Sequence, residues 1–278
     1  MLIRTFRPDD VSFATQLSDL ENWGVSAAEY ECLTSFEPQG CFVAEADGRP
    51  VGMIISIVYG KFGWLTSLLV ASDYRRRGYG RALLDRAVGH LLDRGVRTVG
   101  LDATLEAAPF YQHAGFAPAY EVHHLQRPAL PAPAPVADSF GPLEAKNLHA
   151  VAMFDWAIFG GSRHRALREL LKRSPVAYLA QDQAGVAGYL LARRQNEHWA
   201  IGPWVCVRSE EPLLTAALGA MGHEPVRLAL PEVNRRGCEL LAAHGFHLLR
   251  REVRMYYGDE EGIGQPQYVY AIASSEKG

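Results

Sequence analysis

The order of apolar and polar residues predicts alternating strands and helices in the first half of the chain. Runs rich in β-branched and aromatic residues, bounded by turn residues, predict strands at 2–6, 41–46, 51–59, 62–71 and 96–101 and from 116 onward. Capping residues and apolar positions spaced four apart predict helices at about 9–23, 27–36, 78–94 and 107–114. This alternation is typical of an α/β fold.

The connections between these elements predict how the strands pair. Short turns such as 47–50 favour an antiparallel meander for the three runs between 41 and 71. The helix at 78–94 joins the strand at 62–71 to the strand at 96–101, and such a crossover makes the two strands parallel. We therefore expect a mixed, mostly antiparallel sheet flanked by helices, with one strand–helix–strand unit.

The same order of elements returns after a segment that holds four prolines, which favour an extended linker. Beyond it, Val176–Gly188 aligns without a gap with Gly40–Gly52, and Leu241–Phe246 falls against Tyr111–Phe116. The sequence therefore predicts two divergent copies of one α/β domain. The predicted division is 1–126, a linker at 127–138, and 139–278.

Composition and charge favour a small-molecule partner. The 278 residues are 48% hydrophobic and 21% charged, which is enough apolar material for two ordinary domains. The formal net charge of −3 gives no positive field that would hold the chain on nucleic acid or on an anionic membrane. We expect neither as a partner.

Cysteine and histidine usage argues against disulfides and metal sites. The four cysteines lie in apolar stretches without CxxC spacing, which favours reduced core thiols. The histidines of the second half lack metal-ligand spacing. The N-terminus does not resemble a signal peptide and no run of about 18 apolar residues occurs. We expect a cytoplasmic protein without a metal.

A basic, glycine-bearing turn after the strand at 62–71 carries the clearest chemistry. Its residues are Arg75, Arg76, Arg77, Gly78, Tyr79, Gly80 and Arg81. Backbone N–H groups at a helix start converge on one point with partial positive charge, so such a turn can hold a diphosphate. Glycines let the backbone approach the phosphates, and arginines can add charge-assisted hydrogen bonds. A tight turn without a ligand is the alternative for the glycine pair alone.

In their context, three of these residues resemble a family motif. Arg75, Gly78 and Gly80 match the cofactor loop of the GCN5-related N-acetyltransferase (GNAT) family, which reads Arg/Gln-x-x-Gly-x-Gly/Ala after the fourth strand. The predicted order of elements in 1–126 is similar to the core of that family. A dinucleotide-binding fold is the other glycine-loop interpretation, but this loop lacks the third glycine and follows four strands.

The resemblance implies acetyl-CoA as the cosubstrate and assigns residues to it. The main chain of Leu69 and Val70 would face the pantetheine amides, and the main chain of 76–81 would cradle the pyrophosphate. Tyr111 matches the family's tyrosine that protonates the CoA sulfur, a role open to a phenol of pKa about 10. The backbone amide of Val70 would hold the oxyanion. A tyrosine that only packs its helix is the alternative for Tyr111.

The general base is where the sequence departs from a well-known form of the family. Some members carry a glutamate on the fourth strand, whereas Trp64 stands at that position here and the strand holds no carboxylate. Asp102 is the nearest ionisable candidate, with Glu106 and His113 behind it, and activation through a water is also open. The helical region that forms acceptor walls in this family holds Glu21, Trp23 and Tyr30.

The second copy keeps the framework and loses the loop. At the corresponding helix start stand Glu210, Glu211 and Pro212, two carboxylates where phosphates would lie and a proline without an N–H. We expect these carboxylates to cap the helix themselves. Leu241 replaces the tyrosine, and the copy resembles the degenerate C-terminal acetyltransferase-like domains of tandem family members. We expect it to shape the acceptor pocket without binding CoA.

The sequence therefore predicts an N-acetyltransferase that moves an acetyl or other short acyl group from CoA to a primary amine of a small molecule. The alternative is a non-catalytic acyl-CoA sensor whose second domain binds a partner. The presence of Tyr111 beside the intact loop favours the enzyme. Neither the acceptor nor the oligomeric state follows from the sequence.

Overall fold

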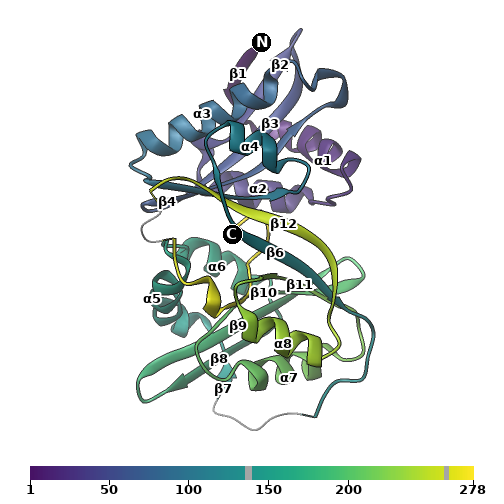
Figure 1. Cartoon of the computed structure of the whole chain (residues 1–278), viewed down its shortest axis with the longest axis vertical. Coiled ribbons are helices and arrows are strands. Elements are labelled where there is room, and N and C mark those ends of the chain that lie inside the picture. Colours follow the sequence, from purple (N-terminus) through teal and green to yellow (C-terminus); the bar gives the residue numbers. More distant parts are fainter. Residues whose placement is uncertain (135–139, 260–262) are drawn as a thin grey trace.

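The computed structural model describes residues 1–134, 140–259 and 263–278, and its first half matches the predicted order of elements (Figure 1). The strands are β1 (Leu2–Thr5), β2 (Phe42–Ala46), β3 (Arg49–Tyr59), β4 (Phe62–Val70), β5 (Thr98–Thr104) and β6 (Ala117–Arg127). The helices are α1 (Val11–Leu20), α2 (Ala27–Phe36), α3 (Tyr79–Asp93) and α4 (Ala108–His113). Every predicted element of this half is confirmed, with ends that shift by a few residues.

The second half repeats this order. Its strands are β7 (Phe140–Pro142), β8 (Val176–Asp182), β9 (Gly185–Gln195), β10 (His198–Cys206), β11 (Val226–Pro231), β12 (His247–Gly258) and β13 (Val269–Ala271). Its helices are α5 (Leu148–Phe159), α6 (His164–Lys172), α7 (Glu210–Met221) and α8 (Arg235–Ala243). Short 3₁₀ turns occur at Pro8–Asp10, Pro38–Gly40, Ser72–Tyr74, Ala145–Asn147 and Pro266–Tyr268.

The internal duplication predicted from the sequence is visible in the backbone. Gly52 pairs with Val70 across β3 and β4, and its counterpart Gly188 pairs with Cys206 across β9 and β10. A Cβ at either glycine would come within 3 Å of the facing strand, so both copies need glycine at this point. The helix-ending bond from Phe116 N to Tyr111 O recurs between Phe246 and Leu241, at 3.0 Å in each case.

Within the described residues the strands form one sheet in the order β1-β2-β3-β4-β5-β12-β6-β11-β10-β9-β8-β7, with β13 paired to β10. The pairs are antiparallel except β4 with β5 and β10 with β11, the two crossover units. This confirms the mixed, mostly antiparallel α/β architecture. Helices cover both faces of the first half: α1 and α2 pack with Trp64 and Leu69 on one face, and α3 packs with Leu65 and Leu101 on the other.

The two halves exchange neighbouring strands, which the sequence did not indicate. Strand β12 of the second half lies between β5 and β6, and β6 of the first half lies between β12 and β11 (Figure 1). The division into 1–126 and 139–278 therefore stays a prediction about units of the chain, because the sheet itself is continuous.

The remaining sequence features are simple to place. Of the predicted linker, residues 135–138 lie outside the described residues, and β6 already extends through Arg127. Cys32, Cys41 and Cys206 are buried and Cys238 is partly buried; the described chain contains no disulfide. None of the helices in the described ranges has both the length and the apolar character needed to cross a membrane.

Candidate active site

Strands β4 and β5 diverge and leave an open edge on β4. They pair only where Phe62, Gly63 and Trp64 face Thr98, Val99 and Gly100. Beyond Trp64, β5 pairs with β12 on its other side, while β4 keeps its pairing with β3 alone. The edge of β4 that faces β5 therefore has no strand partner among the described residues from 65 to 70, which leaves main-chain groups for a ligand.

Alternation along β4 identifies Val70 as a residue that presents its main chain to this edge. The Ala71 N–H donates to Val51 O on β3 at 2.8 Å, so both polar groups of Val70 point the other way. The Leu69 carbonyl instead faces β3, where a Cβ on Gly52 would lie 2.9 Å from it. Of the two residues predicted to face pantetheine, the geometry favours Val70 for the main-chain contact and leaves Leu69 as packing, because its side chain is buried.

The loop after β4 delivers a helix start to the same place. Arg76 and Gly78 adopt positive φ angles of 59° and 87°, and α3 then begins at Tyr79. The first turn of a helix leaves its N–H groups without intrahelical acceptors. In α3 no described side chain caps that turn, so the N–H groups from Tyr79 to Arg81 are available to an anion.

Gly80 lies where three elements meet. A Cβ built on it would lie 3.8 Å from Val70 Cγ2 at the end of β4 and 3.8 Å from Phe110 Cζ on α4. Its φ is not in the left-handed region and both contacts are ordinary, so a methyl fits at this position and a larger branched side chain does not. The predicted phosphate loop, the open edge of β4 and the helix that carries Tyr111 are therefore adjacent.

The four arginines of the loop do different things. Arg75 donates through Nε to Val70 O at 2.9 Å and pairs with Glu21, so it ties the loop to β4 and to the region after α1. Arg81 pairs with Asp85 at 2.8 Å. Arg77 stacks over the Tyr74 ring, with its guanidinium carbon 5.5 Å from the ring centre. Arg76 and Arg77 form no ion pair with a described residue, so they are the arginines free to meet phosphate.

Tyr111 stands on α4 with its ring between Phe110 and Phe116, at centroid distances of 5.1 and 5.9 Å. Its side chain is partly buried, and its hydroxyl makes no hydrogen bond with a described residue. Burial raises the pKa of this phenol, so the hydroxyl holds its proton at neutral pH. A protonated phenol without an internal partner beside the open edge fits the predicted role of proton donor to a thiolate.

Asp102, the first candidate for the base, faces the α1–α2 side of the sheet but is already paired. Its carboxylate accepts from Arg254 of β12, at 2.5 Å for Nε and 3.0 Å for a terminal nitrogen. Burial raises the pKa of Asp102 and the Arg254 charge opposes that rise. The Arg254 guanidinium also lies 4.4 Å from the Trp64 ring centre. This pair braces β5 against β12, and the geometry disfavours Asp102 as the base.

The other residues singled out from the sequence lie apart from this pair. Glu106 is exposed, and His113 contacts Pro109 O through Nδ1 at 2.6 Å. Trp23 is 42% exposed. Of these residues, Tyr30 packs with Trp64 and Leu69 on the α1–α2 face of β4.

Tyr30 meets a strained residue of β4. Ser67 has a φ of 54° at the irregular point of the β3–β4 ladder, and its hydroxyl is buried. The Tyr30 hydroxyl is also buried, and neither oxygen makes a regular hydrogen bond with a described residue. Burial raises the pKa of Tyr30 to about 12, while the nearby Ser18 and Ser67 hydroxyls act against that rise. Positive φ at a non-glycine residue is a form of local strain that clusters at functional sites.

Sequence reasoning missed the segment that covers this face of the sheet. Residues 272–278 pass from the second half to β4, where Trp64 Nε1 donates to Ser275 O at 3.1 Å. Tyr59 donates to Lys277 O at 3.1 Å. No local pattern could have shown this, because the contacts join positions more than 200 residues apart.

In the second copy the equivalent gap is filled by the chain itself. Strands β10 and β11 pair at Trp199 and Ala200 and then diverge, and β13 pairs with β10 beyond that point. Ile272 N, directly after β13, donates to Ala229 O of β11 at 2.9 Å. The expectation that carboxylates cap α7 was wrong, because that helix has no side-chain cap. Glu210 pairs instead with Arg236, and Glu211 contacts His244 at 3.3 Å.

The described residues contain no group of three or more His, Cys, Asp or Glu that could hold a metal ion.

Comparisons with known proteins identify the family of the chain. Residues 9–116 match a model described as the acetyltransferase (GNAT) family, and residues 151–271 match a second model described as an acetyltransferase (GNAT) domain. An acetyltransferase from Sodalis glossinidius is 33% identical over 105 residues, which cover 36% of this chain and 74% of that protein. An uncharacterised N-acetyltransferase from Methanocaldococcus jannaschii is 31% identical over 97 residues, covering 31% of this chain and only 43% of that protein.

Solved structures share the whole fold. A putative acetyltransferase from Pyrococcus horikoshii has a TM-score of 0.83 at 25% identity, covering 100% of this chain and 95% of its own. A tandem GNAT protein from the clavulanic acid biosynthesis pathway has a TM-score of 0.64 at 17% identity, covering 92% of this chain and 98% of its own, which shows a common fold. The chain therefore belongs to the GNAT family of acetyltransferases, as a member with two tandem copies of the fold.

Proposed function

We propose that this chain transfers an acetyl or short acyl group from acyl-CoA to a primary amine of a small molecule, using only its first copy. The observation that carries the proposal is the meeting of three features at Gly80: the uncapped start of α3, the open edge of β4 and the α4 helix of Tyr111. The uncapped helix start suits the diphosphate of CoA, and the open strand edge suits its extended amide chain. The α4 helix supplies a phenol that can protonate the leaving thiolate.

The residue roles follow the polarity of each group. The N–H groups at the start of α3 bind the pyrophosphate, with Arg76 and Arg77 adding charge. Val70 offers its N–H to the thioester oxygen as charge develops there. Tyr111 gives its proton to the departing sulfur. Arg75 acts as a positioning residue, because its bond to Val70 O fixes the loop against the strand.

We propose that the second copy contributes structure and binds no CoA. Its strand gap holds β13, and the first turn of α7 carries the carboxylates of Glu210 and Glu211, which contact Arg236 and His244. A CoA molecule would have to displace a strand and overcome two negative charges there. The proposal therefore gives one acyl-CoA site per chain. It includes no metal and places the protein in the cytoplasm.

The experiment that tests the proposal is thiol release from acetyl-CoA by the whole chain, followed with a panel of small primary amines. An enzyme releases CoA in an amine-dependent manner and yields the N-acetylated amine. A sensor would bind acetyl-CoA, as measured by calorimetry, without releasing thiol for any amine. Absence of binding would reject both forms of the proposal.

A further inference from the structure

Ser67 interrupts β4 within its open edge. In the β3–β4 ladder, Ser67 and Leu68 together stand opposite Ile54, which makes a β-bulge. Ser67 occupies this bulge with a φ of 54°, a strained conformation for a residue that has a side chain. The start of α3, which is the proposed phosphate site, lies beyond Val70 along the chain. The acyl end of a cofactor bound there therefore points back along β4 towards Ser67.

Tyr30 of α2 brings a second hydroxyl to this part of β4. Its ring packs with Trp64 and Leu69 on the α1–α2 face of the strand. Tyr30 is 0% exposed and Ser67 is 4% exposed, and neither hydroxyl oxygen has a hydrogen-bond partner among the described residues. A buried hydroxyl without a partner destabilises a fold, so packing alone does not explain why both are present.

The hydroxyl of Ser18 on α1 belongs to the same group. Ser18 and Ser67 both lie near the Tyr30 hydroxyl and act to lower its pKa. Burial has the larger effect and raises the pKa of Tyr30 to about 12, so Tyr30 keeps its proton and is a donor. Ser18 Oγ accepts from Val25 N at 3.2 Å and has a second lone pair for Tyr30. With Tyr30 donating to Ser18 and Ser67 donating to Tyr30, the Ser67 oxygen keeps its lone pairs for a ligand.

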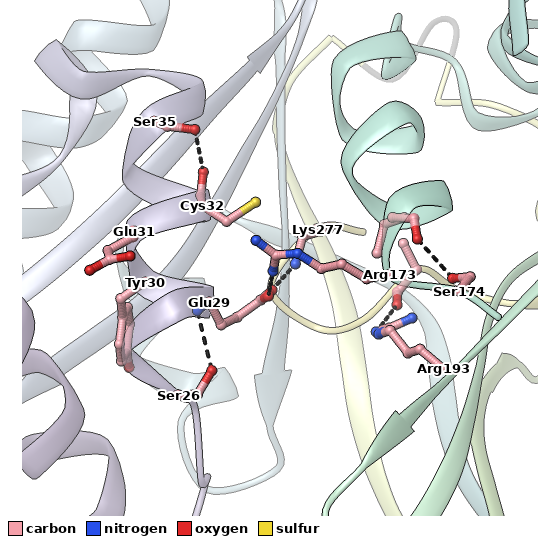
Figure 2. Close-up of polar contacts among 12 residues, drawn as sticks. Ser26, Glu29, Tyr30, Glu31, Cys32, Ser35, Arg173, Ser174, Arg193 and Lys277 are labelled. Atoms are coloured by element: carbon pink, nitrogen blue, oxygen red, sulfur yellow. Dashed lines mark hydrogen bonds and ion pairs between the residues drawn. The ribbon is translucent and has the colours of Figure 1, made fainter. Parts of the chain in front are cut away.

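The carboxylate next to Tyr30 in the chain is not available to an amine. Glu29 pairs with Arg173 at 3.1 Å and also contacts Lys277. Figure 2 shows Glu29 pointing from α2 towards both cations, with Tyr30 on a different side of the helix. The hydroxyls of Ser67 and Tyr30 are therefore the unpartnered polar groups that α2 and β4 bring together on this face.

We propose that the Ser67 hydroxyl, oriented by Tyr30, binds the amine of the acyl acceptor beside the thioester. The inference rests on the proposed function, because it needs a thioester on the open edge of β4. An extended ligand on a strand edge lies about 4.8 Å from that strand, and the Ser67 oxygen stands directly on the Cβ of an edge residue. An amine between the two is within hydrogen-bond reach of Ser67 Oγ.

The donors and acceptors of a primary amine match this arrangement. A neutral amine donates one N–H to Ser67 Oγ, and its lone pair stays free to attack the thioester carbonyl. Tyr111 packs on the α3 face of the sheet, whereas Tyr30 packs on the α1–α2 face, so the amine and the proton donor approach the thioester from opposite faces. The C–N bond forms, the C–S bond breaks, the surplus amine proton leaves to water, and Tyr111 protonates the thiolate.

Steady-state thiol release by the whole chain tests Ser67, with saturating acetyl-CoA and the small primary amine that the wild type turns over fastest. Ser67→Ala removes the hydroxyl, and Ser67→Gly also relieves the positive φ. We expect both variants to lower kcat/KM for the amine about tenfold and to leave the Kd for acetyl-CoA unchanged. Their unfolding temperatures should equal or exceed that of the wild type, because each variant loses a buried hydroxyl that has no partner.

Two further variants separate a role in binding from a role in packing. Tyr30→Phe keeps the ring and should lower kcat/KM by a similar factor, and adding Ser67→Ala to it should lower kcat/KM no further, because the two hydroxyls act as one unit. Ser56→Ala is the matched control, since the hydroxyl of this buried serine on β3 donates to Gly40 O at 2.7 Å. It should lower the unfolding temperature and leave kcat/KM unchanged.

The outcomes distinguish this inference from the proposed function. Wild-type kcat/KM for the amine in Ser67→Ala and Ser67→Gly would overturn the inference and leave the function standing. Weaker acetyl-CoA binding by the same factor as the loss of kcat/KM would also reject it, because Ser67 would then only hold the shape of β4. Additive effects of the Tyr30 and Ser67 substitutions would remove the role given to Tyr30. A wild-type chain that releases no thiol with any amine would lose both proposals.

Discussion

Replacing Gly80 by valine tests whether the start of α3 binds the phosphates of the cofactor. A Cβ at this position has ordinary contacts, 3.8 Å to Val70 Cγ2 and 3.8 Å to Phe110 Cζ. An alanine therefore fits, and it also suits the first turn of a helix better than glycine. Each γ-methyl of a valine extends about 1.5 Å further. Methyls pointed at Val70 or Phe110 would clash, so at least one has to project in front of the N–H groups of α3.

The magnitude follows from what that methyl displaces. A charge-assisted hydrogen bond contributes about 1.5–3 kcal/mol. Since about 1.4 kcal/mol is tenfold in Kd, losing one such bond to phosphate weakens acetyl-CoA binding by about tenfold to a hundredfold. Gly80→Ala should bind within about threefold of the wild type, because its single methyl stays between Val70 and Phe110.

Titration calorimetry with acetyl-CoA on the wild type, Gly80→Ala and Gly80→Val measures this directly, and thermal unfolding checks that all three are folded. A valine variant that is folded and binds with unchanged affinity would refute the assignment of the phosphate site. An equal loss of acetyl-CoA affinity in the alanine and valine variants would also contradict the reasoning. It would show that the packing space beside Gly80, and not the approach of the phosphates to the backbone, limits binding.

Three further predictions concern catalysis, stoichiometry and pH. Tyr111→Phe should lower turnover by about 10² to 10⁴ and leave the Kd for acetyl-CoA unchanged, as measured by steady-state kinetics and calorimetry. The whole chain should bind one acetyl-CoA, and a calorimetric stoichiometry near two would contradict the role given to β13. For Glu252, burial favours a higher pKa, but His124 and Arg250 outweigh it and lower the pKa to about 2. Because this folded-state pKa is depressed, Glu252 stabilises the fold above about pH 4.5 and loses that effect as pH falls to about 2. Denaturant unfolding should show Glu252→Gln less stable than the wild type at pH 7 and nearly equal to it at pH 2; a constant difference would reject the linkage.

Local patterns in the sequence were enough to predict the elements and the loop. The i, i+4 spacing of Leu83, Ala87 and Leu91 reports the buried face of α3, because a helix repeats every 3.6 residues. Gly78 was identified from its neighbours, and its φ of 87° explains why glycine suits the start of that helix. These signals lie within a few residues of one another, which is the range over which sequence pattern reports structure.

Partners of charged residues could not be predicted in the same way. The sequence suggests that Asp102 is an unpaired carboxylate at the end of a strand. In the structure, β12 places Arg254 beside it as an ion-pair partner. The sequence suggests that Arg75 is a phosphate ligand. In the structure its guanidinium instead pairs with Glu21 and donates to the Val70 carbonyl. In both cases the partner lies more than 50 residues away or acts through the backbone, so the neighbouring sequence cannot predict the contact.

The exchange of β6 and β12 changes how the second copy should be understood. Strand β12 supplies Arg254 to Asp102 and the whole antiparallel neighbour of β5, so removing residues 139–278 would expose an unpaired edge on β5 and leave a buried carboxylate without its cation. Loss of one partner of a buried ion pair costs about 3–5 kcal/mol, a large share of the stability of a domain. The isolated second copy would suffer equally, since β11 would lose β6. Each copy therefore completes the sheet of the other, and the β5 side of the proposed acyl-CoA site depends on a strand of the second copy.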